Sequence, residues 1–303
     1  MKTSDLFTAF NAQSDFHLRQ VHLYLNKTYY TNMYATAEQG ITNSIEINKF
    51  KRIEAIWSEY EKNICFAHYT CDRQITQTSV VESALRLHPV YNHPLFDYLR
   101  NEADIDHLKQ FILNESILNL EFFDYLALSI VGANDTVKSE IIHNLWDEAG
   151  KGDVQQFHTT LFKKLLDDLG VSYNRESIIQ TMSWQALAGI NLFSYFATYP
   201  YNKMKYYGLL AATEMLDPPH YKKLILGIGR LFKNKHINHH YYIEHEVIDV
   251  EHADGWLNRI IIPELTKNPY RTIDFWLGFY MRLDSVKKYY DKMLDQFLAQ
   301  QAA

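Results

Sequence analysis

The sequence predicts an all-α protein. Glycine and proline, the residues that most often interrupt helices, are scarce, with 11 and 7 copies among 303 residues. Apolar residues recur near helical spacing in most segments between these breakers, and no part of the chain is rich in strand-like alternation. Hydrophobic residues make up 47% of the chain, which is enough to bury one substantial core. We therefore expect a globular helical protein.

Charge and hydropathy narrow the class of function. The formal net charge is −6 and no long basic run appears, so neither a nucleic acid nor an anionic membrane is favoured as a partner. Charged or amide residues break every apolar run well before the roughly 18 residues that a transmembrane helix needs. The N-terminus carries an early acid at Asp5 and lacks the pattern of a signal peptide. A cytoplasmic protein is the simplest expectation.

Residues 1–90 are expected to form an N-terminal helical extension that packs on the core, which comprises residues 91–303. One broken helix or two short helices fit residues 3–35, and another helix fits residues 44–60. The candidate N-caps are Thr3 or Ser4 for the first segment and Thr42, Asn43 or Ser44 for the second. Between 71 and 94 the pattern is irregular, and Pro89 and Pro94 predict a loop with short helical turns.

Longer periodic segments follow in the core region. After a turn at 95–99, helices are expected at about 108–128, 136–148, 154–169, 175–197, 203–216, 221–232, 245–261 and 271–299. Gly132 ends the first of these, and Asn134 or Asp135 can cap the second. Pro218 and Pro219 are expected to close one helix and to begin the next.

The most informative stretch begins at His245. On a helix, His245, Asp249 and His252 stand at i, i+4 and i+7 and therefore share one side. Apolar residues nearby suggest a long helix largely surrounded by protein; they are Val247, Ile248, Trp256, Ile260 and Ile261. Buried ionisable groups are costly unless they are paired or bound to metal. The alternative is a polar helix face with a His–Asp hydrogen bond.

Three further side chains offer ligands of the same kind: Glu148, His158 and Glu214. With the first three they make three carboxylates and three imidazoles from four helices, a number that suits two metal ions. Mixed nitrogen and oxygen ligands favour iron or manganese over the thiolate-rich sites of structural zinc. A purely structural metal site is the alternative. His239 and His240 are adjacent and point about 100° apart on a helix, so we expect loop or cap roles for them.

The chain resembles the haem-oxygenase-like diiron oxidases and oxygenases, also called iron-containing redox enzymes. The resemblance rests on the segments Asn144–Gly150 with His158, Gly208–Glu214, and His245-x-x-x-Asp249-x-x-His252. It implies an up-and-down bundle of about seven core helices that binds two Fe(II) ions per chain and uses dioxygen to oxidise amino acids, amines or fatty acids. Manganese is possible in place of iron. The implied ligands are Glu148, His158, Glu214, His245, Asp249 and His252, with Glu115 or Glu121 as an additional one.

Other classes of protein remain in competition. Metal-free enzymes of the thiaminase-like or quinone-cofactor-synthase type share this broad architecture, but they need a catalytic cysteine or a polar cofactor pocket, and neither is evident around Cys65 or Cys71. Those two cysteines read as ordinary thiols. A haem ligand at His17 or His22 is formally possible, although surface or capping roles are favoured. A non-enzymatic iron-binding or interaction protein is the third class, in which the extension docks a partner or forms a homodimer.

Overall fold

The computed structural model describes residues 10, 14–34 and 44–302, and these contain helices and turns but no strand. The predicted all-α class is therefore confirmed. The possible caps at Thr3, Ser4, Thr42 and Asn43 lie outside the described residues, and Ser44 is the first described residue of its helix. None of the described helices combines the length and the apolar character needed to cross a membrane.

The chain folds as a succession of helices joined by short connections. The α-helices are α2 (Asp15–Tyr34), α3 (Ser44–His68), α4 (Thr78–Leu87), α5 (Pro94–Asn101), α6 (Ile105–Ser129), α7 (Asp135–Glu148), α8 (His158–Leu169), α9 (Arg175–Thr181), α10 (Trp184–Thr198), α11 (Lys203–Leu231), α12 (His240–Asp254), α13 (Ile262–Lys267) and α14 (Thr272–Gln301). A π-helix, η4 (Gly255–Ile261), joins α12 to α13.

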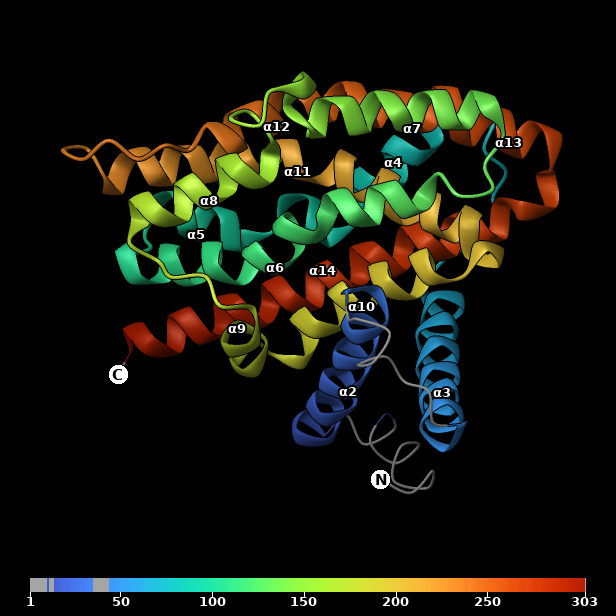
Figure 1. Cartoon of the computed structure of the whole chain (residues 1–303), viewed down its shortest axis with the longest axis horizontal. Helices are drawn as coiled ribbons and strands as arrows, with labels where there is room; N and C mark the ends of the chain where they lie inside the picture. Colours follow the sequence, from blue (N-terminus) through green and yellow to red (C-terminus); the bar gives the residue numbers. More distant parts are fainter. Residues whose placement is uncertain (1–9, 11–13, 35–43, 303) are drawn as a thin grey trace.

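Two long helices, α11 and α14, form the centre of the bundle. They pack on each other, and α11 also contacts α5, α6 and α12, whereas α14 contacts α3, α5 and α10. Figure 1 shows α7, α8 and α12 on one side of this pair and α2 and α3 projecting from the other side. The side chains that the sequence singled out as ligands belong to α7, α8, α11 and α12.

Glycines let α11 and α14 approach to backbone contact. A Cβ placed on Gly278 would collide with the carbonyl oxygen of Lys205, and one placed on Gly208 would collide with the carbonyl oxygen of Phe275. No side chain fits at either position, because real Cβ atoms do not come within 3.0 Å of such atoms. This close crossing fixes the position of α11, which carries the buried Glu214.

The N-terminal helix α2 rests on α10 through buried amides. The Asn191 side chain donates to His22 Nδ1 at 3.3 Å and to the His22 carbonyl at 3.0 Å, and Asn26 donates to Asn191 at 3.2 Å. His22 is fully buried, so a surface or capping role for it is wrong, whereas His17 is exposed and contacts Ser14. The division of the chain into 1–90 and 91–303 stays a prediction.

Several helix boundaries differ from the sequence prediction. The segment 78–87 forms the helix α4 instead of a loop, because Val81, Ala84 and Leu85 find a buried position. A single helix predicted at 175–197 is divided at Ser183, whose side chain accepts from the Ala186 amide and so caps α10.

The prediction that Pro218 and Pro219 end a helix is wrong. Both lie inside α11, which continues for 29 residues. Proline lacks the N–H that would bond to the carbonyl four residues earlier, so the carbonyls of Glu214 and Met215 lose their helical partners. Buried residues on both sides of the prolines keep the helix in one piece; they include Leu216, Tyr221 and Leu224.

The helix predicted at 154–169 begins only at His158. Asp153 forms a turn in which it accepts from the Gln155 amide through its side chain and from the Gln156 amide through its carbonyl. Val154 is consequently exposed and makes no part of the apolar face. His158 thus becomes the first residue of α8.

Candidate metal centre

The six side chains predicted as ligands meet in the bundle interior. They form two groups, Glu148–His158–His245 and Glu214–Asp249–His252, and within each group the possible ligand atoms lie within 4.8 Å of one another. All six residues are buried, with exposed fractions between 1% and 5%. The structure therefore brings the predicted residues together, and their role as ligands stays a prediction.

A tight turn between α7 and α8 positions the first group. Gly150 has a φ of +60°, and a Cβ there would collide with the backbone of Gln156. Only glycine fits such a position without strain. The turn ends α7 at Glu148 and begins α8 at His158, so that Glu148 Oε2 lies 2.8 Å from His158 Nδ1.

Helix α12 supplies candidate ligands from successive turns of one face. His245, Asp249 and His252 are buried, as their i, i+4, i+7 spacing predicts. Val247, however, is 71% exposed, so the prediction that the helix is largely surrounded by protein is wrong for this part. Because α12 packs on α8 and α11 from one side, its outer face remains at the surface, whereas five of the seven residues of the following π-helix are buried.

The imidazoles of α12 are held by one nitrogen each. His245 Nδ1 lies 2.7 Å from the Tyr241 carbonyl oxygen, and its Nε2 is 3.7 Å from Glu148 Oε1. His252 Nε2 lies 3.2 Å from Asp147 Oδ2, and its Nδ1 is 3.5 Å from Glu214 Oε2. Metal-binding histidines usually donate one ring N–H to a carbonyl or carboxylate and present the other nitrogen to the metal. Both histidines have this arrangement.

Buried atoms without hydrogen-bond partners line the space between these side chains. They are Glu148 Oε1, His158 Nδ1, Glu214 Oε1, Asp249 Oδ1 and His252 Nδ1. Three of them approach only other members of the two groups, without the geometry of a hydrogen bond: His158 Nδ1 lies 2.8 Å from Glu148 Oε2, Glu148 Oε1 3.7 Å from His245 Nε2, and His252 Nδ1 3.5 Å from Glu214 Oε2. Most buried polar atoms in proteins have a partner, and each exception calls for an explanation such as an ion. Carboxylate oxygens and imidazole nitrogens are the donors that iron and manganese accept. The residues present thus fit a pair of divalent cations.

The electrostatics of the centre also favour cations. Burial raises the pKa of Asp249 well above its ordinary value, and the nearby charges of Glu214, Asp217 and Glu148 raise it further. Burial opposes protonation of His252, but the Glu214, Glu148 and Asp147 carboxylates raise its pKa to about 9. In the first group burial raises the pKa of Glu148, but His158 and His245 outweigh burial and hold it below its ordinary value. Around Asp249 and His252 the neighbouring carboxylates contribute negative charge that bound divalent cations would neutralise.

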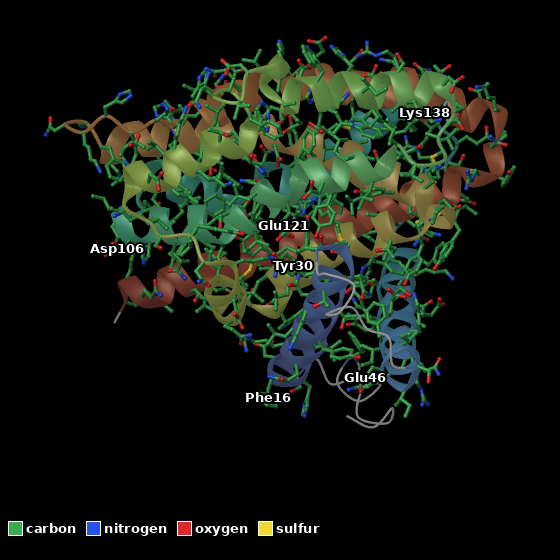
Figure 2. All side chains as sticks on the ribbon, viewed as in Figure 1. Phe16, Tyr30, Glu46, Asp106, Glu121 and Lys138 are labelled. Carbon is green, nitrogen blue, oxygen red and sulfur yellow. The ribbon has the colours of Figure 1, made fainter. Side chains whose placement is uncertain are left out.

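The two candidates for an additional ligand lie in different places. Glu121 forms an ion pair with Arg175 and accepts from the Tyr125 hydroxyl. In Figure 2 it lies beside Tyr30 of α2, over whose ring the Arg175 guanidinium stacks. Glu115, in contrast, lines a cavity that also contains Glu214, His245 and Asp249. Of the two candidates for an additional ligand, Glu115 is therefore the one that lies next to the six candidate ligands.

Cavities reach the centre from two directions. An inner cavity of about 20 Å³ touches Glu214, His245 and Asp249; it is also lined by Glu115, Asn119, Thr213, Asp217, Tyr221 and Arg282. An outer cavity of about 430 Å³ reaches Glu214 from the surface between α4, α11 and α12. Its walls are mostly apolar and include Leu85, Met215, Pro218, Pro219, Val250 and Leu257. Volumes of a few hundred Å³ are typical of small-molecule sites.

Sequence reasoning missed three residues of this region. Asp147 neighbours Glu148, but adjacent helical residues point in different directions, so nothing in the sequence linked it to His252. Arg282 carries a clearer signal, since it is the single charge in the otherwise apolar stretch 275–283. Asp217 precedes two prolines that were expected to end the helix, which concealed its inward position.

His239, His240 and the two cysteines lie outside the centre. His239 precedes α12 and His240 is its first residue, with its Nε2 3.0 Å from Glu244. Neither belongs to the two groups of candidate ligands, in keeping with the expected loop or cap roles. Cys65 and Cys71 are buried free thiols.

Fold and site together define a class: an all-α bundle whose interior holds two neighbouring groups of carboxylates and histidines. The family of iron-containing redox enzymes matches residues 109–287, which is more than half of the chain. The chain therefore belongs to this family. The matched range contains all six candidate ligands and the inner cavity's Arg282.

Solved structures share the fold. A domain of unknown function with a haem-oxygenase-like fold from Shewanella denitrificans OS217 superposes with a TM-score of 0.59, at 14% identity, over 75% of this chain and 96% of its own. A CADD-like protein of unknown function from Nostoc punctiforme PCC 73102 has a TM-score of 0.55, at 16% identity, over 74% and 96%. The predicted haem-oxygenase-like architecture is thus confirmed. No curated protein matches the sequence.

Proposed function

We propose that this protein is a non-haem diiron oxidoreductase that uses dioxygen to oxidise a small organic substrate. The observation that carries the proposal is the set of buried inward atoms that have no hydrogen-bond partner outside the two groups of candidate ligands. A polar surface of this kind is costly in a bundle interior unless cations bind it. The choice of iron as the metal rests on the family, whose members are described as iron-containing redox enzymes.

Each part of the site has a defined task in this proposal. Glu148, His158 and His245 would hold one ion, and Glu214, Asp249 and His252 the other; manganese fits the same ligands. When bound, two Fe(II) ions supply the electrons with which dioxygen is activated. Asp147 keeps the His252 ring in the orientation that turns Nδ1 inward.

Aromatic residues shield the His245 side of the centre from water. Tyr241 packs its ring 4.1 Å from that of His245, and Phe162 packs edge-on against Tyr241 at 4.8 Å. Tyr221 lies edge-on to His245 at 6.0 Å. A dry surrounding protects reactive species from side reactions and strengthens the electrostatic interactions of the site. Such walls are suited to an oxidation rather than to hydrolysis.

The test combines metal content with oxygen consumption. After anaerobic loading with Fe(II), the wild type is expected to bind two irons per chain, and His245→Ala and Asp249→Ala to bind fewer. His240→Ala is the matched control, because His240 begins the same helix but pairs with Glu244 outside the site. Exposure to air with a panel of amino acids, amines and fatty acids should then give substrate-dependent oxygen uptake in the wild type and the control only.

Two results would contradict the proposal. Iron that binds equally well to the wild type and to both site variants would place the metal elsewhere. Specific iron binding without oxygen uptake for any compound in the panel would favour an iron-binding protein that is not an enzyme.

A further inference from the structure

Arg282 of α14 is a buried cation without an anionic partner. Its exposed fraction is 7%, and its Nε donates to Thr213 Oγ1 at 2.9 Å. The guanidinium carbon lies 5.0 Å from the centre of the Phe193 ring. No carboxylate among the described residues comes within 4.0 Å of it. Burial of an unpaired charge is expensive, so this position calls for an anion.

Two carboxyl groups face the same space. Glu115 and Asp217 both line the inner cavity with Arg282, and neither forms an ion pair with a described residue. Asp217 accepts only a long hydrogen bond, 3.3 Å, from Tyr221. Each carboxyl would gain from a cation.

The charged groups adjoin both the metal centre and an apolar recess. The inner cavity runs from Arg282 to His245 and Asp249. A side cavity of about 30 Å³ shares Glu115, Leu118 and Arg282 with it; its apolar walls include Met182, Ile190 and Val286. Cavities of 20 and 30 Å³ hold only water, so a larger ligand requires the shared side chains to move apart.

We propose that the inner cavity binds a free amino acid as its zwitterion, with Arg282 receiving the carboxylate and Glu115 and Asp217 receiving the ammonium group. This inference rests on the proposed function, of which it names the substrate class. Arginine binds carboxylates through two parallel hydrogen bonds, which also fixes their orientation. The remainder of the amino acid then has the metal centre on one side and the apolar recess on the other.

Other substrate classes leave part of the cluster without a partner. A fatty acid has no ammonium group, so Glu115 and Asp217 would remain unpaired. A simple amine lacks an anion for Arg282. The outer cavity is apolar enough for an aliphatic chain, and the exposed Arg86 at its edge is already 3.8 Å from Glu82.

The test measures binding under anaerobic conditions, where no turnover occurs. Isothermal titration calorimetry measures the affinity for four kinds of compound. They are the common amino acids, the matching carboxylic acids without the amino group, the matching amines and a fatty acid. Each compound is titrated into the Fe(II)-loaded chain and into the metal-free chain. At least one amino acid should bind on the order of 30-fold more tightly than its matched acid and amine. The amine leaves the buried Arg282 without an anion, and the acid leaves the half-buried Glu115 and Asp217 without a cation.

Variants then assign the two ends of the ligand. Arg282→Gln should weaken the amino acid on the order of 30-fold or more and abolish its preference over the matched amine. Glu115→Gln and Asp217→Asn should abolish its preference over the matched carboxylic acid instead. Arg86→Gln at the outer cavity is the control and should bind as the wild type does. Arg282→Lys, which keeps the charge, should retain part of the affinity if Arg282→Gln does not fold.

Preferential binding of a fatty acid or a simple amine would overturn the inference, as would a loss of amino acid binding in Arg86→Gln without one in Arg282→Gln. Iron content, measured on the same samples, separates this from the proposed function. A chain that binds two irons but no amino acid refutes only the substrate class. A chain that binds an amino acid but no iron refutes only the metal centre.

Discussion

Asp147 is not itself a candidate ligand, but it orients the ring of one, His252. Its carboxylate holds His252 Nε2 at 3.2 Å and also lies 3.4 Å from the Lys151 amine. Removing the charge should weaken the hydrogen bond that orients the His252 ring. Partners of this kind typically alter metal affinity 10- to 100-fold.

We accordingly predict that Asp147→Asn lowers iron affinity by roughly 10- to 100-fold while the fold is retained. A competition titration with an Fe(II) chelator measures this, with circular dichroism to report on the helices. Asp153→Asn, in the exposed turn before α8, serves as the control. Equal iron affinity in Asp147→Asn and wild type would show that the His252 contact does not matter for binding.

A second residue-scale prediction concerns pH. Burial lowers the pKa of His220 to about 3, although Nε2 lies 3.1 Å from the Val90 carbonyl oxygen. In the unfolded chain His220 takes up a proton near its ordinary pKa of about 6.5. The unfolded state therefore binds more protons below pH 6.5, and stability falls as the pH falls from there toward 3.

Between pH 7 and pH 5, His220 should account for about 2 kcal/mol of this loss. Urea unfolding of the wild type and of His220→Gln at both pH values isolates the contribution, since glutamine keeps a donor for the carbonyl but does not titrate. The difference in free energy of unfolding between pH 7 and 5 should be about 2 kcal/mol smaller in the variant. An identical pH dependence in both proteins would show that His220 is protonated in the folded state.

At the residue scale the sequence predicted the α12 stripe well, because His245, Asp249 and His252 lie on one helix and the helical period alone aligns them. The candidate ligands on the other helices could not be aligned in this way. Residue type singled out Glu148, His158 and Glu214 as possible ligands, and the family resemblance supported them, but helix rotation is set by tertiary packing, so the sequence could not show that they meet. For the same reason Glu115 and Glu121, six residues apart on α6, could not be separated until their surroundings were known.

Helices α11 and α14 illustrate constraints that act on whole elements. Their crossing depends on Gly208 and Gly278, where no Cβ fits. We predict that Gly278→Ala lowers the free energy of unfolding by about 1–3 kcal/mol or more, because the backbones must separate. Gly229→Ala is the control: it lies on α11, where an added methyl group would meet nothing within 4 Å, and should gain up to about 1 kcal/mol of helix propensity.

Urea unfolding curves of the two variants make the comparison direct. A Gly278→Ala protein as stable as Gly229→Ala would contradict the close crossing of α11 and α14.

The turn between α7 and α8 permits a similar comparison. Gly150→Ala meets both a φ of +60° and a clash with the Gln156 backbone, so we predict that His158 moves away from Glu148 and that the first group loses its iron. Gly170→Ala has a φ of +67° but nothing within 4 Å, and should cost only about 1–2 kcal/mol in stability with iron binding intact.

Iron content and the free energy of unfolding, measured on both variants, distinguish strain from displacement. Full iron binding in Gly150→Ala would mean that the turn does not position His158.

The element boundaries that were missed share a physical cause. Proline normally ends a helix, yet α11 passes through Pro218 and Pro219 because its flanking residues are buried on both sides. Likewise α4 owes its helix to burial of Val81 and Leu85 rather than to a strong local signal. Local propensity determined the type of most elements, whereas tertiary contacts decided where they end.

For the molecule as a whole, the all-α class followed from the composition and the helical period, and the haem-oxygenase-like arrangement followed from the resemblance. The solved structures that share the fold cover about three quarters of this chain. Contacts between α2 and α10 through His22 and Asn191 were beyond prediction, because buried amides have no sequence pattern of their own.

The central claim is that one chain holds two iron ions, one in each group of ligands. Anaerobic Fe(II) titration with equilibrium dialysis on the wild type, His158→Ala and His252→Ala tests it most directly, since each variant damages a different group. The account predicts two irons in the wild type and one tightly bound iron in each variant. The claim would be contradicted if the wild type bound no iron specifically. It would also be contradicted if both variants bound as much iron as the wild type.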